Sequence, residues 1–200
     1  MEISIFKSVK DTSNPYHKPL SYFLGRIKNG SPATPNILEY RVNFDENLKK
    51  NLPCATFSGT FSYRNKENLI KFSQIAVLDY DKFPNNQKAR EFKSKIIQSE
   101  YVYACFLSPS DKGVKVLFKV VDEPENYEAL YRGLLSEFSD PHIDKSTKDI
   151  CRLCYESYDP ELYVNENAKE WSKYEIEDVT EIGKNIISIT VPLKSESRIL

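Results

Sequence analysis

Apolar and polar positions follow two periods along this chain, and together they predict a succession of strands and helices. Short apolar runs predict strands at residues 2–9, 55–61, 75–81, 102–108, 114–121, 150–157 and 186–191. Helical spacing predicts helices at residues 19–28, within 36–51, over 86–98 and after Pro124, and a partial helix in the charged segment 166–181. This order predicts an α/β (α+β) fold with a mixed, largely antiparallel sheet flanked by helices.

The strand predicted at residues 75–81 reads Ile-Ala-Val-Leu-Asp-Tyr-Asp and ends in two carboxylates. Its run of four apolar residues is typical of a strand covered on both faces. Because strand side chains alternate, Asp79 and Asp81 point to the same side, with Cα atoms about 6.6 to 7 Å apart. Such carboxylates can share a divalent cation. In the alternative, Asp79 starts a turn and Asp81 caps the helix after Pro84.

The turn between the strands predicted at 102–108 and 114–121 gathers hydroxyl and ammonium groups around Gly113. These groups belong to Ser108, Ser110, Lys112 and Lys115. Hydroxyls, backbone amides and ammonium groups suit a phosphate, although a glycine turn with two lysines is also common on protein surfaces. Lys115 favours phosphate binding, because its strand is expected to pair near the strand that carries Asp79.

A third polar cluster follows the helix predicted after Pro124 and contains Asp144, Arg152 and Ser157. Arg152 lies inside a predicted apolar strand, where a guanidinium must reach an anion to offset its desolvation. A bound triphosphate could be that anion. An ordinary ion pair with Asp149 or Glu156 is the alternative.

Composition limits the functional classes. The chain has 200 residues, which suits one domain, and 28 basic against 29 acidic residues give a net charge of −1, so a uniformly basic nucleic-acid coat is excluded. The start of the sequence lacks signal-peptide character and no stretch approaches a membrane span, so we expect a cytoplasmic protein without membrane contact.

The four cysteines fit a reducing compartment. Cys151 and Cys154 form a Cys-x-x-Cys pair, and a zinc site would need two more ligands from Cys54, Cys105 and His142. Free cysteine is among the residue types most often buried, so we expect structural cysteines instead.

Four segments together resemble a known family. They are Leu52-Pro-Cys-Ala-Thr-Phe-Ser-Gly-Thr-Phe61, the Leu-Asp-Tyr-Asp run, Ser108-Pro-Ser-Asp-Lys-Gly-Val-Lys115 and the stretch from Asp144 to Pro160. In this order they resemble the N-terminal domain of VirE-like (BT4734-like) proteins from bacterial mobile elements and phages. That domain is similar to the archaeo-eukaryotic primase superfamily, the primase-polymerases. The resemblance covers about residues 1–165.

The resemblance implies an RRM-like core and a nucleotidyltransferase that binds DNA, as template or primer, and a nucleoside triphosphate. It assigns Asp79, Asp81 and Asp144 to catalysis and to Mg²⁺ or Mn²⁺. It assigns the triphosphate to Ser108, Ser110, Lys112, Lys115, Arg152 and Ser157. The chain departs from the family pattern at Lys115, where active primases usually carry a histidine that a lysine cannot replace in geometry or proton chemistry.

Two further expectations follow from the resemblance. Residues 1–165 would form one primase-polymerase-like domain, with an N-terminal layer at 1–60 and a catalytic-type core at 61–165, and 166–200 would be an extension. The alternative to an enzyme is an inactive module of the same fold that binds nucleotide or nucleic acid and recruits a replicative helicase.

Overall fold

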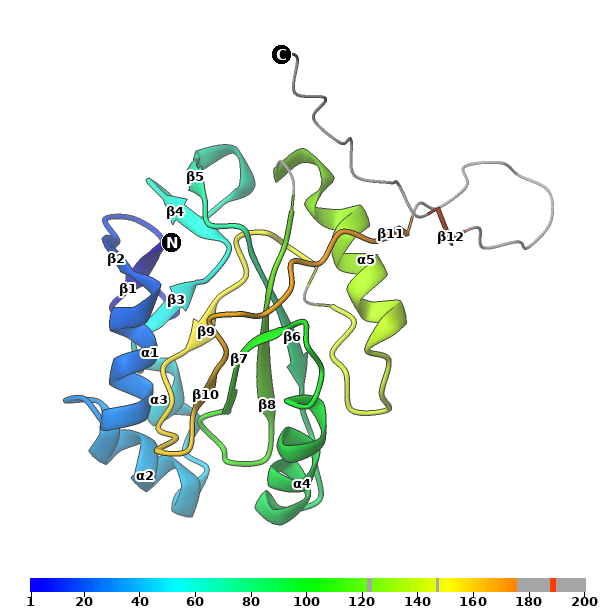
Figure 1. The fold of residues 1–200 in the computed structure, drawn as a ribbon. Helices are drawn as coiled ribbons and strands as arrows, with labels where there is room; N and C mark the ends of the chain where they lie inside the picture. Colours follow the sequence, from blue (N-terminus) through cyan, green and yellow to red (C-terminus); the bar gives the residue numbers. More distant parts are fainter. Residues whose placement is uncertain (122–123, 147, 176–187, 190–200) are drawn as a thin grey trace.

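The computed structural model is a mixed α/β fold with antiparallel sheets and, among the described residues, five helices (Figure 1). The structure describes residues 1–121, 124–146, 148–175 and 188–189. The helices are α1 (Leu20–Asn29), α2 (Thr34–Asn43), α3 (Glu46–Lys50), α4 (Asn86–Ile96) and α5 (Tyr127–Glu137), with 3₁₀ turns η1 (Lys66–Asn68) and η2 (Pro124–Asn126). The strands are β1 (Glu2–Phe6), β2 (Tyr16–Pro19), β3 (Cys54–Thr56), β4 (Gly59–Phe61), β5 (Leu69–Phe72), β6 (Ile75–Tyr80), β7 (Val102–Leu107), β8 (Val114–Lys119), β9 (Cys154–Tyr155), β10 (Tyr163–Val164), β11 (Tyr174–Glu175) and β12 (Ser188–Ile189).

The central sheet has the strand order β10-β7-β8-β6, and each neighbouring pair is antiparallel. Strands β6 and β7 therefore run parallel to each other with β8 between them, and α4 connects them. Strand β10, the last of this sheet in chain order, pairs with β7 at the edge opposite β6. This arrangement brings the carboxyl end of β6 beside the β7–β8 hairpin, where the candidate site lies.

The two faces of the central sheet pack into different cores. Ala76, Leu78 and Tyr80 of β6 face α4 and α5, with Ala89 and Leu130 among the residues they join. Ile75 and Val77 belong to the other core, which contains α1 and the N-terminal strands. Since side chains alternate along a strand, Asp79 continues the row of Ile75 and Val77 and faces the N-terminal layer.

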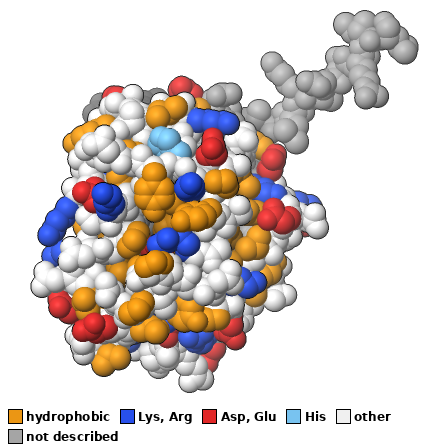
Figure 2. Space-filling view, turned by 90° about the vertical axis from the view of Figure 1, so that its left-hand side faces the viewer, with side chains coloured by type: hydrophobic (Ala, Val, Ile, Leu, Met, Phe, Trp, Pro, Cys, Tyr) orange, Lys and Arg blue, Asp and Glu red, His pale blue; other side chains and the backbone are white. Residues whose placement is uncertain are grey.

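The N-terminal layer is a second antiparallel sheet with the order β2-β1-β3-β9 (Figure 1). Its last strand, β9, comes from late in the chain and pairs with β3, with Ala55 opposite Cys154. The segment before β9 therefore passes between the central sheet and this layer. Figure 2 shows the face of β2 and α1, where apolar and basic side chains are interspersed; there Lys18 and Arg26 lie 5.8 and 5.9 Å from the ring centre of Tyr22.

Several predicted elements differ from the structure. The strand predicted at 150–157 is wrong except for β9, because this segment is a crossing between two sheets and pairs with β3 over two residues only. The strand predicted at 55–61 is two strands, since the chain turns at Phe57 and Ser58 and β4 then pairs with β5. The helix predicted within 36–51 is interrupted at Phe44, which has the left-handed conformation.

The C-terminal predictions fall partly outside the described residues. In the described part of 166–181, no helix forms, and β11 is a short strand at Tyr174–Glu175. Of the strand predicted at 186–191, the structure describes β12, which pairs with β11. The remaining positions of both predictions lie outside the described residues.

Candidate functional site

Three carboxylates that lie far apart in the sequence meet at the end of β6. Asp79, Asp81 and Asp144 each offer an oxygen within 4.8 Å of the other two. The backbone explains the meeting, because the Asp81 N–H donates to the carbonyl of His142 at 2.8 Å and the Asp144 N–H donates to the carbonyl of Asp79 at 2.8 Å. The loop with Ile143 thus extends the sheet beside β6 by a single bridge. We call these three residues the carboxylate cluster.

The alternative role of Asp81 as a helix cap is wrong. Helix α4 is capped by Asn85, whose side chain accepts a hydrogen bond from the backbone N–H of Lys88 at 2.9 Å. Asp81 is thereby left available to the carboxylate cluster.

Lys115 of β8 forms an ion pair with Asp79 of β6. The two residues are direct partners in the antiparallel register, and the Lys115 ammonium donates to Oδ2 of Asp79. Their side chains are 10% and 9% exposed, so the pair is almost completely removed from water. Burial, the largest single influence, lowers the pKa of Lys115, but the charge of Asp79, the hydrogen bond to Asp79 and the charge of Asp81 act together in the opposite direction, and the net pKa is raised above its usual value.

The second oxygen of Asp79 has no protein partner. Oδ1 is buried, and among the described residues it accepts no hydrogen bond. Burial raises the pKa of Asp79, the charges of Asp81 and Asp144 raise it further, and Lys115 only partly opposes them. A buried carboxylate oxygen that accepts no hydrogen bond, beside two more carboxylates, fits a hard divalent cation such as Mg²⁺ or Mn²⁺.

Asp144 has a more polar environment than Asp79. Burial acts to raise its pKa, but hydrogen bonds from the side chain and backbone of Ser146 and the charges of Arg152 and Lys115 lower it overall. The Arg152 guanidinium lies 3.5 Å from Oδ2 of Asp144. Neither sequence alternative for Arg152 named this partner. Glu156 instead pairs with Arg26 at 2.8 Å.

A cavity of about 410 Å³ opens beside the carboxylate cluster. It is lined by residues 81–82 and 141–146, so both Asp81 and Asp144 border it. Arg152 lies beside Asp144, and 48% of its side chain is accessible to solvent. A phosphate-bearing ligand could therefore reach the carboxylates from solvent.

The β7–β8 hairpin packs directly against the carboxylate cluster. A Cβ at Gly113 would lie 2.5 Å from Oδ1 of Asp81, so the close approach requires glycine. The backbone N–H of Phe83 also donates to the carbonyl of Lys112 at 3.1 Å. The hydroxyls of Ser108 and Ser110 lie 3.0 Å apart, with Ser108 largely buried.

Ser157 lies inside the scaffold of the hairpin. It is 1% exposed, and its hydroxyl donates to the carbonyl of Leu107 at 2.6 Å. The neighbouring Asp159 accepts hydrogen bonds from the Leu107 N–H at 2.9 Å and from Lys93 at 2.6 Å. These contacts support the hairpin base and leave Ser157 no free hydroxyl for a ligand.

Two residues near the site were not found from the sequence. Arg41 of α2 donates to the carbonyls of Pro109 at 3.1 Å and Tyr158 at 2.6 Å, and so ties the hairpin to the segment after β9. Phe44, which ends α2, lies beside Lys112 of the hairpin, with the ammonium 4.6 Å from the ring centre. Both positions come from long-range packing, which no local sequence pattern marks.

All four cysteines lie in the described part of the chain. Cys54, Cys105 and Cys154 are buried and free, which agrees with the burial expected of structural cysteines, and Cys151 is partly buried. The group of possible metal ligands found there contains carboxylates only.

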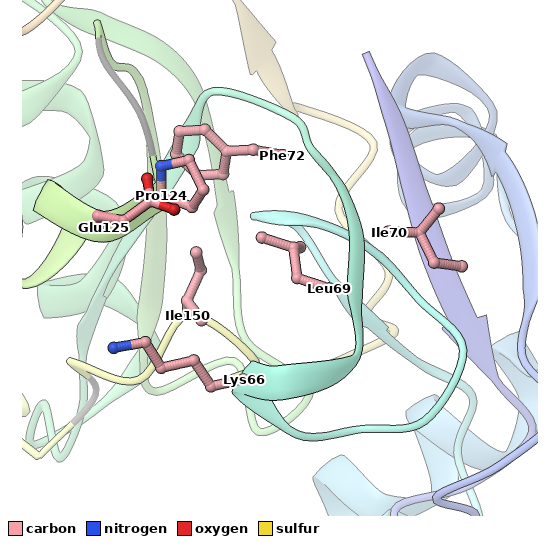
Figure 3. A pocket seen from close by; sticks show the side chains of 7 residues that line it. All are labelled: Lys66, Leu69, Ile70, Phe72, Pro124, Glu125 and Ile150. Carbon is pink, nitrogen blue, oxygen red and sulfur yellow. The ribbon is translucent and has the colours of Figure 1, made fainter.

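A second cavity, of about 490 Å³, lies away from the carboxylate cluster between β5 and η2 (Figure 3). Leu69, Phe72, Pro124 and Ile150 form its apolar wall, with Lys66 and Glu125 at its margin. Its walls do not gather the carboxylate and cationic groups that converge at the end of β6.

Comparison with known proteins identifies the family. The model of the BT4734-like N-terminal domain matches residues 47–164, which include β6, the hairpin and the whole carboxylate cluster. The chain belongs to this family. No curated protein and no solved structure matches the chain. None of the described helices combines the length and apolar character needed to cross a membrane.

Proposed function

We propose that this domain is a metal-dependent nucleotidyltransferase of the primase-polymerase type, acting in the replication of a mobile element or phage. The observation that carries the proposal is the carboxylate cluster. In it a buried Asp79 oxygen lies next to Asp81 and Asp144 and has no hydrogen-bond partner within the described part of the chain. Family membership supports it. The unit β6-α4-β7, split by β8, supports an RRM-like core, because split β-α-β units build such folds.

In this proposal the chain's residues have distinct roles. Asp79, Asp81 and Asp144 would hold Mg²⁺ or Mn²⁺, and the bound cation would activate a 3′ hydroxyl and offset the charge of the triphosphate. Arg152, half exposed beside Asp144, binds the phosphates by its planar guanidinium. Lys112 supplies a second positive charge from the hairpin.

Lys115 has a positioning role in this proposal. Its ammonium partly neutralises Asp79 and favours the ionised form of that carboxylate, which the cation needs. Because the ammonium is buried against Asp79, it is not free to act as a proton donor in place of the histidine of related primases.

A primer-extension assay tests the proposed activity. A DNA primer on a single-stranded template is incubated with deoxynucleoside triphosphates and Mn²⁺, and extension is expected with the wild-type chain. The Asp81→Asn/Asp144→Asn double variant should lose extension while it remains folded, because both residues are partly exposed and Asp79 keeps Lys115. Equal extension by both proteins, or none by either, would contradict the proposal.

The second candidate is an inactive module that binds nucleotide or DNA and recruits a replicative helicase. The specific observation in its favour is the Lys115–Asp79 ion pair, since it engages one carboxylate of the cluster. This candidate predicts binding of nucleoside triphosphate that does not depend on Mn²⁺. It also predicts no primer extension by the wild-type chain.

A further inference from the structure

Phe44 has a backbone conformation that a phenylalanine rarely adopts. It ends α2 with φ 52° and ψ 33°, and its N–H donates to the carbonyl of Tyr40 at 2.8 Å. This left-handed position normally carries glycine or asparagine, because a Cβ is strained there. Strained residues in folded proteins cluster at ligand sites. The strained conformation of Phe44 therefore indicates that its side chain has a role that offsets the strain.

The ring of Phe44 does not contribute to the core. The residue is 44% exposed. Among the described residues its one aromatic neighbour is Tyr40, edge-on, with the two ring centres 5.9 Å apart. The ammonium of Lys112 lies 4.6 Å from the ring centre. An exposed aromatic ring paired with a cation is the arrangement by which proteins stack nucleobases and bind the adjoining phosphates.

This pair of residues adjoins the carboxylate cluster. Lys112 precedes Gly113, where an added Cβ would meet Asp81 at 2.5 Å. Tyr40 contacts the Phe44 ring and lies near enough to Asp81 for that charge to raise its pKa, after larger contributions from burial and Glu46. Two consecutive hairpin residues thus contact the two groups, Lys112 beside the Phe44 ring and Gly113 against Asp81.

We propose that Phe44 and Lys112 form a subsite for a nucleobase and its phosphate, next to the carboxylate cluster. The class of ligand rests on the proposed function. The base stacks on the Phe44 ring, and the ammonium of Lys112, on its flexible stem, turns to the phosphate. Phe44 precedes the residues matched by the family model, which begin at position 47, so family membership does not assign Phe44 a role in ligand binding.

Two sources of the nucleobase share this chemistry, the nucleoside triphosphate and a single-stranded nucleic acid. The experiment distinguishes them with three probes in the presence of Mn²⁺. Titration calorimetry measures dATP and inorganic tripolyphosphate, and fluorescence anisotropy measures a labelled oligo-dA strand. Tripolyphosphate has no base, so it reports the phosphate contacts and the carboxylate cluster without stacking on the Phe44 ring.

The Phe44→Gly variant is the sharpest test, because glycine relieves the left-handed strain and should leave the melting temperature unchanged or higher. Its affinity for one base-containing probe should fall about 5-fold to 150-fold, the range for losing one stacked base. Its affinity for tripolyphosphate should stay at the wild-type value. Val42→Ala is the matched control, since Val42 is 78% exposed on the same helix, and it should change none of the three affinities.

The outcomes separate this inference from the proposed function. A weaker dATP affinity assigns the subsite to the incoming nucleotide, and a weaker oligo-dA affinity assigns it to the strand. If Phe44→Gly binds both probes as the wild-type chain does, or if the wild-type chain binds neither, the subsite is refuted. If the wild-type chain shows no Mn²⁺-dependent tripolyphosphate binding while Phe44→Gly still weakens a base-containing probe, the proposed function fails and the subsite stands.

Discussion

Asp79 and Lys115 face each other across β6 and β8 as direct partners in the strand register, and both are buried. The ammonium satisfies Oδ2 of Asp79, while Oδ1 accepts no hydrogen bond from any residue that the structure describes. A buried carboxylate that is half satisfied is unfavourable unless a further cation approaches it. This pair therefore links the stability of the sheet to the occupancy of the carboxylate cluster.

Replacing Lys115 by methionine should destabilise the metal-free chain by about 3 to 5 kcal/mol, because it leaves Asp79 charged and buried without its partner. Mn²⁺ should recover part of this loss, so it should raise the melting temperature of Lys115→Met more than that of the wild-type chain. Thermal unfolding with and without Mn²⁺ measures both effects. Lys119→Met is the matched control on β8, because the Lys119 ammonium donates to the carbonyl of Glu166 and lies 5.1 Å from the ring centre of Tyr103, and pairs with neither Asp79, Asp81 nor Asp144 among the described residues. Equal Mn²⁺ shifts in all three proteins would contradict the account.

The raised pKa of Asp79 predicts the pH dependence of metal binding. Because the folded state holds its proton more tightly than an unfolded chain does, the stability from protonated Asp79 is complete at low pH and is lost as pH rises through the folded pKa. Mn²⁺ competes with that proton, so its affinity should fall with decreasing pH, beginning above the usual range of an aspartate. Calorimetric titration across pH measures this fall. In Asp79→Asn the fall should begin at lower pH, and an unchanged profile would refute the assignment to Asp79.

Asp144 should act in the opposite direction on the stability of the chain. Its pKa is lowered, so its contribution is present above the unfolded value and is lost as pH falls through the folded pKa. Denaturant unfolding of wild-type and Asp144→Asn chains in acid compares the two. The wild-type chain should lose more stability on acidification than the variant, and parallel losses would contradict the account.

Gly113→Ala should disturb the carboxylate cluster more than the fold. Its Cβ would lie 2.5 Å from Oδ1 of Asp81 and 2.9 Å from the carbonyl of Tyr80, so the Asp81 side chain must shift. We expect the Mn²⁺ affinity to fall about tenfold or more, which equals about 1.4 kcal/mol. Gly25→Ala is the control, because nothing lies within 4 Å of its Cβ and alanine should stabilise α1 by up to about 1 kcal/mol. A wild-type Mn²⁺ affinity in Gly113→Ala would show that Asp81 is not a ligand.

Variants of Ser157 and Arg152 should distinguish a residue that stabilises the fold from one that binds the nucleotide. Ser157→Ala removes a buried hydrogen bond to the carbonyl of Leu107, so it should lower the free energy of unfolding by about 1 to 3 kcal/mol and leave the affinity for dATP unchanged. Arg152→Gln should lower the affinity for dATP and not the stability, because the Arg152 side chain is half exposed and its ion pair in the described structure is with Asp144. We expect a several-fold lower affinity for dATP and little change in stability. A loss of dATP affinity in folded Ser157→Ala would restore the ligand role that its family resemblance implies.

The sequence predicted the central sheet because its strands carry strong local patterns. The apolar run before Asp79 predicted β6, and side-chain alternation predicted that Asp79 and Asp81 act together. Asp144 was placed with them only by resemblance, since the bridge between Ile143 and Tyr80 joins segments more than sixty residues apart. Local pattern cannot specify that pairing.

The wrong predictions arise where tertiary contacts override local preference. The segment around Arg152 has strand-like apolar residues but crosses between two cores, so only Cys154 and Tyr155 find a strand partner. Phe44 breaks a predicted helix although phenylalanine has no preference for the left-handed conformation, and no sequence signal marks it.

The most direct test of the account is the coupling between Mn²⁺ and dATP, measured by titrating dATP with and without Mn²⁺ into the wild-type chain and into Asp81→Asn/Asp144→Asn. The account predicts that Mn²⁺ raises the wild-type affinity for dATP at least about tenfold and leaves the affinity of the double variant unchanged. If the wild-type chain binds dATP equally well in both conditions, the carboxylate cluster is not a metal site for nucleotide, and the central claim is wrong.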